Sequence, residues 1–298
     1  MTRLKRFVAE KQIPREWSTA DVVERIIKPE TAARRCRYVE LLDAAVVGIA
    51  DLFASHTWGA SFVDFVAAVE HVAEESMFVW VDIFAVRQCA ARHAPAACCL
   101  PLTRCPALAR RWPGNVADLD FRPVVRDATA FLLVAKHMEE VAAMNVLDAV
   151  AGKVPEVAFK ECAYFRIWCV VELGAAVHFA KPVVMLVGGA GEDGAFEPES
   201  GMLANLFDLV DVRKAVASVP ADRERELRKV EAQEGGADAV TTLAKGAIAG
   251  AANCMARRDI LAAAVGNLAA LDVLETKEDR EEAMLKAAAG GYVAVVRR

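Results

Sequence analysis

The chain has 298 residues, of which 55% are hydrophobic and 26% are charged, and its formal net charge is −5. This composition supports a sizeable buried core and excludes an intrinsically disordered chain. No apolar run is both long enough to span a membrane and free of charge, and no basic block is large enough for a nucleic-acid surface. We therefore expect neither a membrane nor a nucleic acid among the partners.

The N-terminus and the cysteines indicate a cytoplasmic protein with reduced thiols. The first residues, Met1 to Arg6, are basic, but no apolar stretch of signal-peptide length follows them. Four of the eight cysteines gather with a histidine in one segment: Cys89, His93, Cys98, Cys99 and Cys105. Because this segment has no paired C-x-x-C knuckle, we expect neither zinc nor another metal.

The chain divides into three predicted parts, a helical N-terminal segment, an α/β domain and a helical C-terminal extension: 1–45, 46–195 and 196–298. In the first part, Ser18 and Asp21 resemble a capping box at a helix start. Pro29 marks the start of a second helix that runs to Leu42. We expect the charged side chains of this second helix on a solvated face: Arg34, Arg35, Arg37 and Glu40.

Four short apolar runs in the central part predict strands: 46–55, 77–84, 128–135 and 182–187. Helical periodicity separates them at 61–75 and from about 155 to 180. Because strands alternate with helices, we expect a parallel sheet with helices on both faces. The glycine-rich run 188–191 follows the fourth strand, and it lacks the spacing of a phosphate-binding loop.

Polar residues follow the predicted strands, where parallel sheets bind their ligands. They are Ser55, His56, Thr57 and Trp58 after the first strand, Asp82 late in the second, Arg87 and Gln88 beyond it, and Lys136 and His137 after the third. Because the carboxyl ends of parallel strands share one edge, we expect these side chains along that edge. Each also has a structural interpretation, such as packing for Trp58 and capping of a turn for Asp82.

One carboxylate interrupts an otherwise apolar helix. From Ile167 to Val177, Glu172 is the only residue that is neither apolar nor glycine, and it shares a helical face with Trp168. A carboxylate there is costly unless it is paired, hydrogen-bonded or placed in a cleft, so a structural ion pair and a functional site both remain open. Arg166 lies on a different turn and face, which argues against direct pairing with Glu172.

Three segments of the sequence resemble motifs of known families. The segment 54–59, ASHTWG, resembles the L-S-H-x-W-G of heterokaryon-incompatibility (HET) domains, and 80–88, WVDIFAVRQ, resembles their W-I-D-x-x-C-I-x-Q. The segment 166–172, RIWCVVE, resembles their R-x-W-x-x-Q-E. Read as 168–173, WCVVEL, it also resembles the W-C-x-x-E-L of Toll/interleukin-1 receptor (TIR) domains.

The TIR resemblance implies a flavodoxin-like fold and a signalling or defence role. Many TIR domains cleave the nicotinamide–ribose bond of NAD, and their catalytic glutamate corresponds to Glu172. NAD is then a substrate and not a tightly bound cofactor. The resemblance and the sheet edge together give the candidate binding residues Ser55, His56, Trp58, Asp82, Arg87, Gln88, Arg166 and Trp168.

Two other functions remain open. A non-enzymatic adaptor that associates with itself or with other TIR-like domains needs no exposed carboxylate. A nucleoside-processing enzyme related to deoxyribosyltransferases would also place a carboxylate near ribose. The chain departs from the HET motifs at Val171, where they have Gln, and at Ala85, where they have Cys. These departures concern the substrate site more than the fold.

Overall fold

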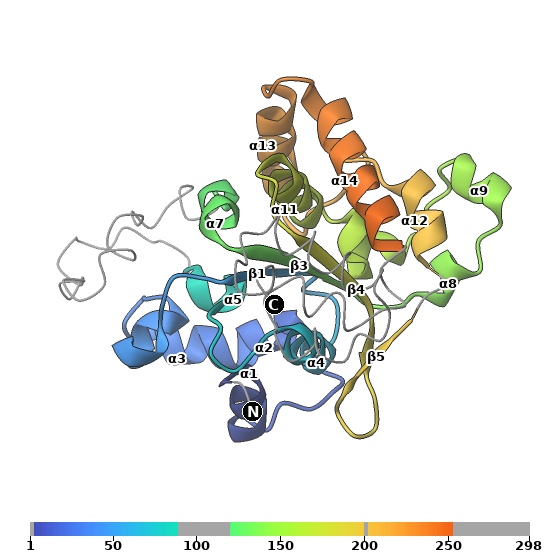
Figure 1. Cartoon of the computed structure of the whole chain (residues 1–298). Helices are drawn as coiled ribbons and strands as arrows, with labels where there is room; N and C mark the ends of the chain where they lie inside the picture. Colours follow the sequence, from blue (N-terminus) through green and yellow to red (C-terminus); the bar gives the residue numbers. More distant parts are fainter. Residues whose placement is uncertain (1–2, 89–119, 200–201, 253–298) are drawn as a thin grey trace, which may run out of the picture.

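The structure is a computed structural model, and it describes residues 3–88, 120–199 and 202–252 (Figure 1). The cysteine-rich segment 89–105 and the end of the predicted C-terminal extension, 253–298, lie outside the described residues. The expectation that the cysteine-rich segment binds no zinc therefore stays a prediction.

A mostly parallel, five-stranded sheet forms the centre of the molecule, with the strand order β2-β1-β3-β4-β5. The strands are β1 (Leu52–His56), β2 (Val79–Trp80), β3 (Ala130–Ala135), β4 (Val183–Ala190) and β5 (Phe196–Pro198). Strands β1 to β4 are parallel to their neighbours, and β5 is antiparallel to β4. This topology confirms the predicted α/β class with a flavodoxin-like sheet.

The first, second and fourth predicted strands differ from the observed ones, and the first begins only at Leu52 instead of at residue 46. Strand β2 covers only two residues, and Asp82 begins a short helix, α5 (Asp82–Ala85), so its predicted position late in a strand was wrong. The chain turns there because Oδ1 of Asp82 accepts a hydrogen bond from the Ile83 amide at 2.7 Å. At the other end of the sheet, β4 continues through Gly188 and Gly189, which pair with β5.

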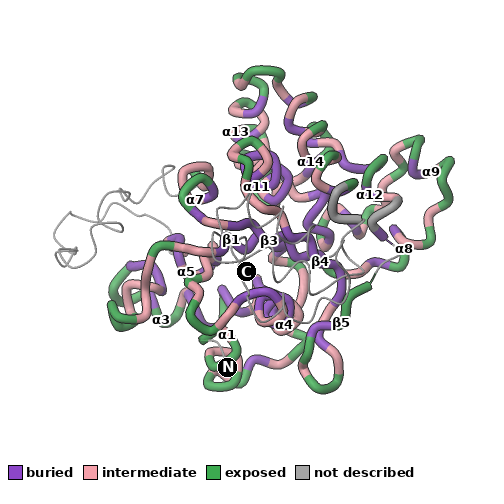
Figure 2. The backbone as a smooth tube through the Cα atoms, viewed as in Figure 1, coloured by how far each residue is buried: buried purple, intermediate pink, exposed green. Residues whose placement is uncertain are grey.

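The two faces of the sheet bury separate cores, because side chains alternate along each strand. Phe53 and Leu133 point into one core, whereas Leu52 and Leu132 point into the other. Figure 1 shows the N-terminal helices on one side of the sheet and the helices of the C-terminal half on the other. Figure 2 shows the buried residues gathered in the strands and on the helix sides that face them. Helices on both faces are thus confirmed.

The N-terminal layer contains α1 (Arg3–Glu10), α2 (Thr19–Val22), the π-helix η1 (Val23–Ile27), α3 (Lys28–Ala32), the 3-10 helices η2 (Tyr38–Leu41) and η3 (Ala44–Val46), and α4 (Phe62–Val72). The capping box of Ser18 and Asp21 is present. The predicted helix from Pro29 to Leu42 was wrong, because α3 ends at Ala32 and Arg35 turns the chain with a φ of 46°.

This turn also reverses the expected exposure of Arg37. The side chain was predicted on a solvated helical face, but Arg37 is buried and lies between the buried residues Cys36 and Tyr38. Its Nε is 3.5 Å from Oε1 of Glu40, and that ion pair partly offsets the cost of burying the guanidinium.

The opposite layer consists of α7 (Arg122–Asp127), α8 (Glu139–Ala142), α9 (Val146–Val150), α10 (Ala158–Glu161), the 3-10 helix η6 (Ala163–Phe165), α11 (Ile167–His178), α12 (Leu203–Leu209), α13 (Pro220–Glu231) and α14 (Gly236–Ala252). The predicted continuous helix from 155 to 180 was wrong. Extended backbone at Cys162 and Arg166 interrupts it, and Phe165 and Ile167 exchange main-chain hydrogen bonds with Val216 instead.

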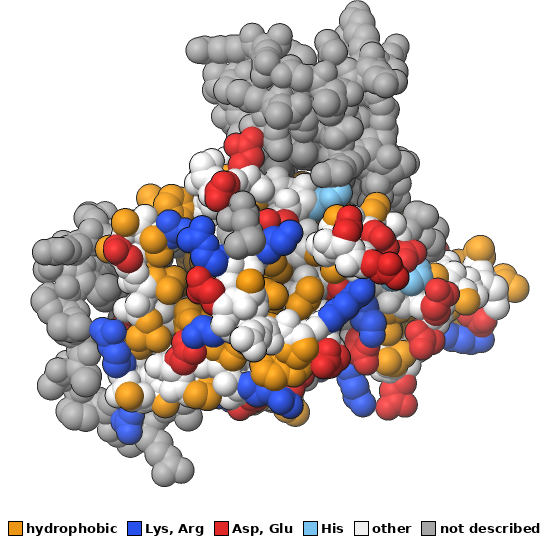
Figure 3. Space-filling model, turned by 90° about the horizontal axis from the view of Figure 1, so that it is seen from below, with side chains coloured by type: hydrophobic (Ala, Val, Ile, Leu, Met, Phe, Trp, Pro, Cys, Tyr) orange, Lys and Arg blue, Asp and Glu red, His pale blue; other side chains and the backbone are white. Residues whose placement is uncertain are grey.

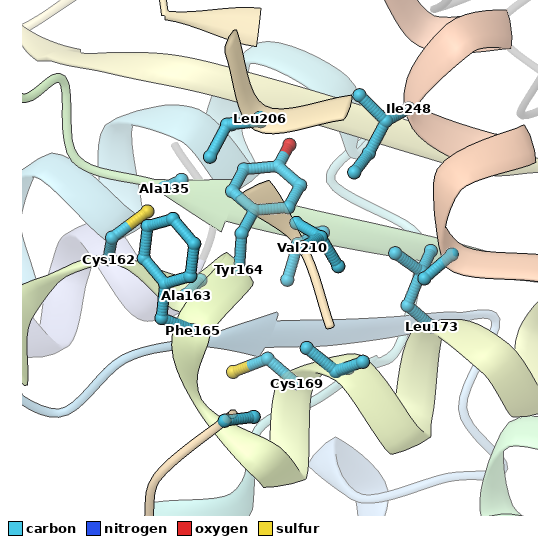
Figure 4. Packing of buried hydrophobic residues seen from close by; sticks show 14 of the residues in the cluster. Ala135, Cys162, Ala163, Tyr164, Phe165, Cys169, Leu173, Leu206, Val210 and Ile248 are labelled. Carbon is cyan, nitrogen blue, oxygen red and sulfur yellow. The ribbon is translucent and has the colours of Figure 1, made fainter. Parts of the chain in front are cut away.

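The core around α11 contains polar atoms among apolar side chains (Figure 4). Cys162 and Cys169 are buried free thiols, and burial raises the pKa of Cys162 to about 12, so both stay neutral packing groups. The Tyr164 hydroxyl points toward Leu206 and Ile248 in Figure 4, and it has no hydrogen-bond partner among the described residues.

No helix within the described ranges has the length and apolar character needed to cross a membrane. On the face in Figure 3, basic and acidic side chains are interspersed with hydrophobic ones. The described residues of that face therefore form no extended surface of a single charge.

Candidate functional site

The candidate site lies where the carboxyl end of β1 meets α5 and α11. Strand alternation places Ser55 on the same face as Phe53, toward α11, and places His56 on the face of Leu52 and Ala54. Neighbouring residues of one motif are therefore directed into opposite layers of the molecule.

Ser55 and Glu172 form a buried hydrogen bond across 117 residues of sequence. The Ser55 hydroxyl donates to Oε2 of Glu172 at 2.6 Å, and Glu172 is only 7% exposed. The pKa of Glu172 is raised to about 8, mainly by burial; the Ser55 hydrogen bond lowers it, and the charges of Asp82 and Glu226 contribute to the rise. Among the described residues, no lysine or arginine pairs with this carboxylate.

Trp58 and Asp82 form a second carboxylate contact close by. The indole Nε1 of Trp58 donates to Oδ2 of Asp82 at 2.7 Å. Burial raises the pKa of Asp82 to about 6, although the hydrogen bonds from Trp58 and Ile83 act in the opposite direction. Asp82 and Glu172 are thus two carboxyl groups with raised pKa values, and the charge of Asp82 contributes to raising the pKa of Glu172, as occurs in acid–base sites.

A row of aromatic rings runs beside the carboxyl groups. The ring of Phe53 stacks on Trp80 with centroids 4.3 Å apart, Trp80 contacts Phe121 at 5.2 Å, and Phe121 contacts Trp168 at 5.3 Å. Arg225 of α13 lies over the Trp168 ring, 5.5 Å from its centroid. Trp168 thus has packing partners of its own, and Phe121 extends the aromatic surface beyond the motif residues Trp80 and Trp168.

His56 lies on the face opposite Glu172. Its Nε2 is 3.0 Å from the Thr19 hydroxyl, and its ring stacks on Phe65 with centroids 3.9 Å apart. Burial lowers the pKa of His56 to about 3, so the ring is neutral at physiological pH. Only its carbonyl oxygen has a partner on the α11 side, where it accepts from the Cys169 thiol at 3.4 Å.

Arg166 caps the start of α11 and does not pair with Glu172, as its spacing predicts. Its Nη1 donates to the Phe159 carbonyl at 3.1 Å and its Nη2 donates to the Ser218 hydroxyl at 2.6 Å. Burial lowers the pKa of the Arg166 guanidinium. Its role in the structure is to join α11 to the segment before α13.

Of the remaining predicted residues, Arg87 and Gln88 follow α5, and Lys136 follows β3. Gln88 donates from Nε2 to the Asp82 carbonyl at 3.5 Å, a long contact. Arg87 has a buried Nε without a hydrogen-bond partner among the described residues. Lys136, after β3, pairs with Glu161 at 2.7 Å. The structure thus brings Ser55, Trp58, Asp82, Gln88 and Glu172 together and separates His56 from them.

Two neighbours of Glu172 are absent from the sequence predictions. Cys169 precedes it by one helical turn, a spacing visible in the sequence, and the charge of Glu172 raises the pKa of this thiol after burial does. Glu226 comes from α13, is buried, and accepts hydrogen bonds from Arg225 at 3.0 Å and Lys229 at 2.9 Å. The sequence offers no signal for its position because a charged stretch such as 222–234 normally faces solvent.

Other kinds of site find less support. In the described ranges, no three His, Cys, Asp or Glu side chains are grouped as metal ligands. A polar cavity of about 260 Å³ lies between α9, α12 and α14, and it shares no residue with the carboxyl pair. Its cationic side chains Arg213, Lys214 and Lys245 alternate with the carboxylates Asp208, Asp211 and Asp238, so it offers no charge preference.

Comparison of the chain with protein-family models, with curated proteins and with solved structures finds no match in any of the three.

Proposed function

We propose that the chain is a TIR/HET-like signalling or defence module that cleaves the nicotinamide–ribose bond of NAD, with Glu172 as the key carboxylate. The observation that supports this proposal is the meeting of the three motif segments. The first segment bonds to the third through Ser55 and Glu172 at 2.6 Å, and to the second through Trp58 and Asp82 at 2.7 Å. The first segment is thus hydrogen-bonded to both of the others, which supports a common site for the three motifs.

The chemistry needs little more than a carboxylate beside the ribose. The bond between ribose C1′ and the pyridinium nitrogen breaks, its electron pair leaves with neutral nicotinamide, and positive charge develops on the ribose. Ionised Glu172 stabilises that charge, and water then adds to C1′ and gives up a proton. The aromatic surface of Trp80, Phe121 and Trp168 suits the flat base.

The protonation of Glu172 gives this activity a defined pH dependence. With a pKa of about 8, the free enzyme holds Glu172 mainly protonated at pH 7. The cationic nicotinamide of the substrate favours the ionised form, as an opposite charge does for any buried acid. We expect kcat/KM to rise as the pH increases toward 8 and to level off above it, because kcat/KM reports the ionisation of the free enzyme.

Nicotinamide release from NAD by the purified full-length protein tests the proposal. The variant Glu172→Gln keeps the size of the side chain but removes its charge, and it should lower kcat by about 10²-fold or more. Glu161→Gln is the matched control, because Glu161 is a partly exposed carboxylate paired with Lys136 and should leave the rate unchanged. No release by the wild type, or equal release by Glu172→Gln, contradicts the proposal.

A second function, a self-associating adaptor without enzymatic activity, is favoured by an exposed apolar surface on α9. Val146, Leu147 and Val150 project from this helix, and Leu147 is 82% exposed. If this surface joins two copies of the chain, light scattering should show a mass that rises with protein concentration, and Leu147→Asp should hold the protein monomeric. A wild type that is monomeric throughout the concentration series contradicts the adaptor function.

A further inference from the structure

The Ser55 hydroxyl lies where it can fix the orientation of the Glu172 carboxylate. We propose that Ser55 is a positioning residue, whose hydroxyl fixes Oε2 of Glu172 and stabilises the ionised carboxylate, so that Oε1 remains for the ligand. This inference rests on the proposed function for its catalytic consequence. The hydrogen bond itself can be tested without any activity.

The backbone around Ser55 is held more firmly than that of a loop residue. Ser55 pairs with Leu133 in the parallel ladder of β1 and β3, which includes every residue of β1 from Leu52 to His56. The side chain of Ser55 is buried, and on the partner helix Leu173 and Ala176 are buried against the same core. A 2.6 Å contact between two such elements fixes the carboxylate within a narrow range of orientations.

Of the groups that act on Glu172, the Ser55 hydroxyl is the one that stabilises the ionised carboxylate. Asp82 on α5 and Glu226 on α13 are acidic, and their charges oppose ionisation of Glu172, whereas the buried Cys169 thiol on α11 is neutral. Among the described residues, no cation of the neighbouring elements pairs with Glu172, although the buried Nε of Arg87 and the buried Nη2 of Arg225 have no hydrogen-bond partner there. Arg225 and Lys229 bond to Glu226, and Arg166 bonds to Phe159 and Ser218.

One oxygen of Glu172 therefore differs from the other. Oε2 accepts the Ser55 hydrogen bond, whereas Oε1 makes no hydrogen bond to the described residues. A carboxylate held by one oxygen can direct its second oxygen at a ribose hydroxyl or at the anomeric carbon without losing its anchor. Removing the hydroxyl should therefore impair the chemical step more than substrate binding.

Kinetics of nicotinamide release from NAD test the catalytic part. In Ser55→Ala, the acidic limb of the kcat/KM profile should shift to higher pH by about one unit. At a given pH below the pKa, this shift lowers kcat/KM by about tenfold. The KM should change by less than about twofold, because the lost contact is to Glu172 and not to the ligand. Ser55→Thr, which keeps a hydroxyl, should restore the wild-type profile. A Ser55→Ala profile that superimposes on the wild type overturns the proposal.

Urea unfolding of the full chain at pH 5.5 and pH 9 tests the hydrogen bond independently of activity. Ser55→Ala should lower stability more at pH 9, where Glu172 is ionised, than at pH 5.5. This extra loss should disappear when Glu172→Gln is already present, as a double-mutant cycle reveals. If the extra loss persists with Glu172→Gln, Ser55 does not act through Glu172. A wild type that releases no nicotinamide would contradict the proposed function while leaving this cycle to decide the role of Ser55.

Discussion

Glu172→Gln is expected to increase the free energy of unfolding, and this increase should be about 3 kcal/mol larger at pH 8 than at pH 5. The folded protein holds Glu172 with a pKa of about 8, compared with 4.5 for an unburied glutamate, so the unfolded chain releases this proton at a lower pH than the folded one. As the pH rises from 4.5 to 8, ionisation of Glu172 lowers the free energy of the unfolded state but not that of the folded state. Each pKa unit corresponds to about 1.4 kcal/mol, and glutamine does not ionise.

Unfolding in urea at pH 5, 6.5 and 8 measures this difference. The matched control is again Glu161→Gln, since its exposed ion pair should contribute less than about 1 kcal/mol at any of these pH values. A stability difference between Glu172→Gln and the wild type that is the same at all three pH values would show that Glu172 ionises normally in the folded protein.

Gly188→Ala is expected to destabilise the protein by about 3 kcal/mol or more. Gly188 has a φ of 148°, and a Cβ added there would lie 2.1 Å from the main-chain oxygen of Glu197 and 3.0 Å from Cζ of Phe196. The nearest atom is backbone of the paired strand β5, so relief requires β4 and β5 to separate. Both the backbone conformation and the contact penalise a side chain at this position.

Gly246→Ala provides the contrast in the same chain. Gly246 lies inside α14, and a Cβ added there meets nothing within 4 Å. The substitution should stabilise the protein by up to about 1 kcal/mol, because alanine favours the helix and loses less backbone entropy on folding than glycine does. Urea unfolding of both variants measures the two effects, and a Gly188→Ala variant as stable as the wild type would mean that β4 and β5 are not paired as described.

The glycine run illustrates what a local pattern leaves undecided. The sequence shows that Gly188 and Gly189 lack the spacing of a phosphate-binding loop, and the structure gives a different reason for them. Gly189 approaches Asp64 of α4, whose Oδ1 accepts a hydrogen bond from the Ala190 amide at 2.9 Å. Close approach between β4, β5 and α4 requires small residues here, and that approach depends on partners distant in sequence.

One helix boundary that the prediction missed depends on contacts between distant parts of the chain. An apolar run predicts β3 or β4 because a strand that is buried on both faces needs apolar residues at successive positions, whichever elements cover it. The break at Arg166 instead depends on main-chain hydrogen bonds of Phe165 and Ile167 to Val216, about fifty residues away. The end of α3 and the burial of Arg37 likewise result from a local turn at Arg35 that the charge pattern does not reveal.

The sequence alone determined the α/β class and the unusual place of Glu172 among apolar residues, because periodicity and composition are local properties. Only the tertiary structure decided that Ser55 faces Glu172, that Trp58 faces Asp82 and that His56 turns away to Thr19. Alternation along β1 assigns its residues to two faces, but which layer covers each face depends on packing between elements far apart in the chain. The carboxylate pair therefore exists only in the folded protein.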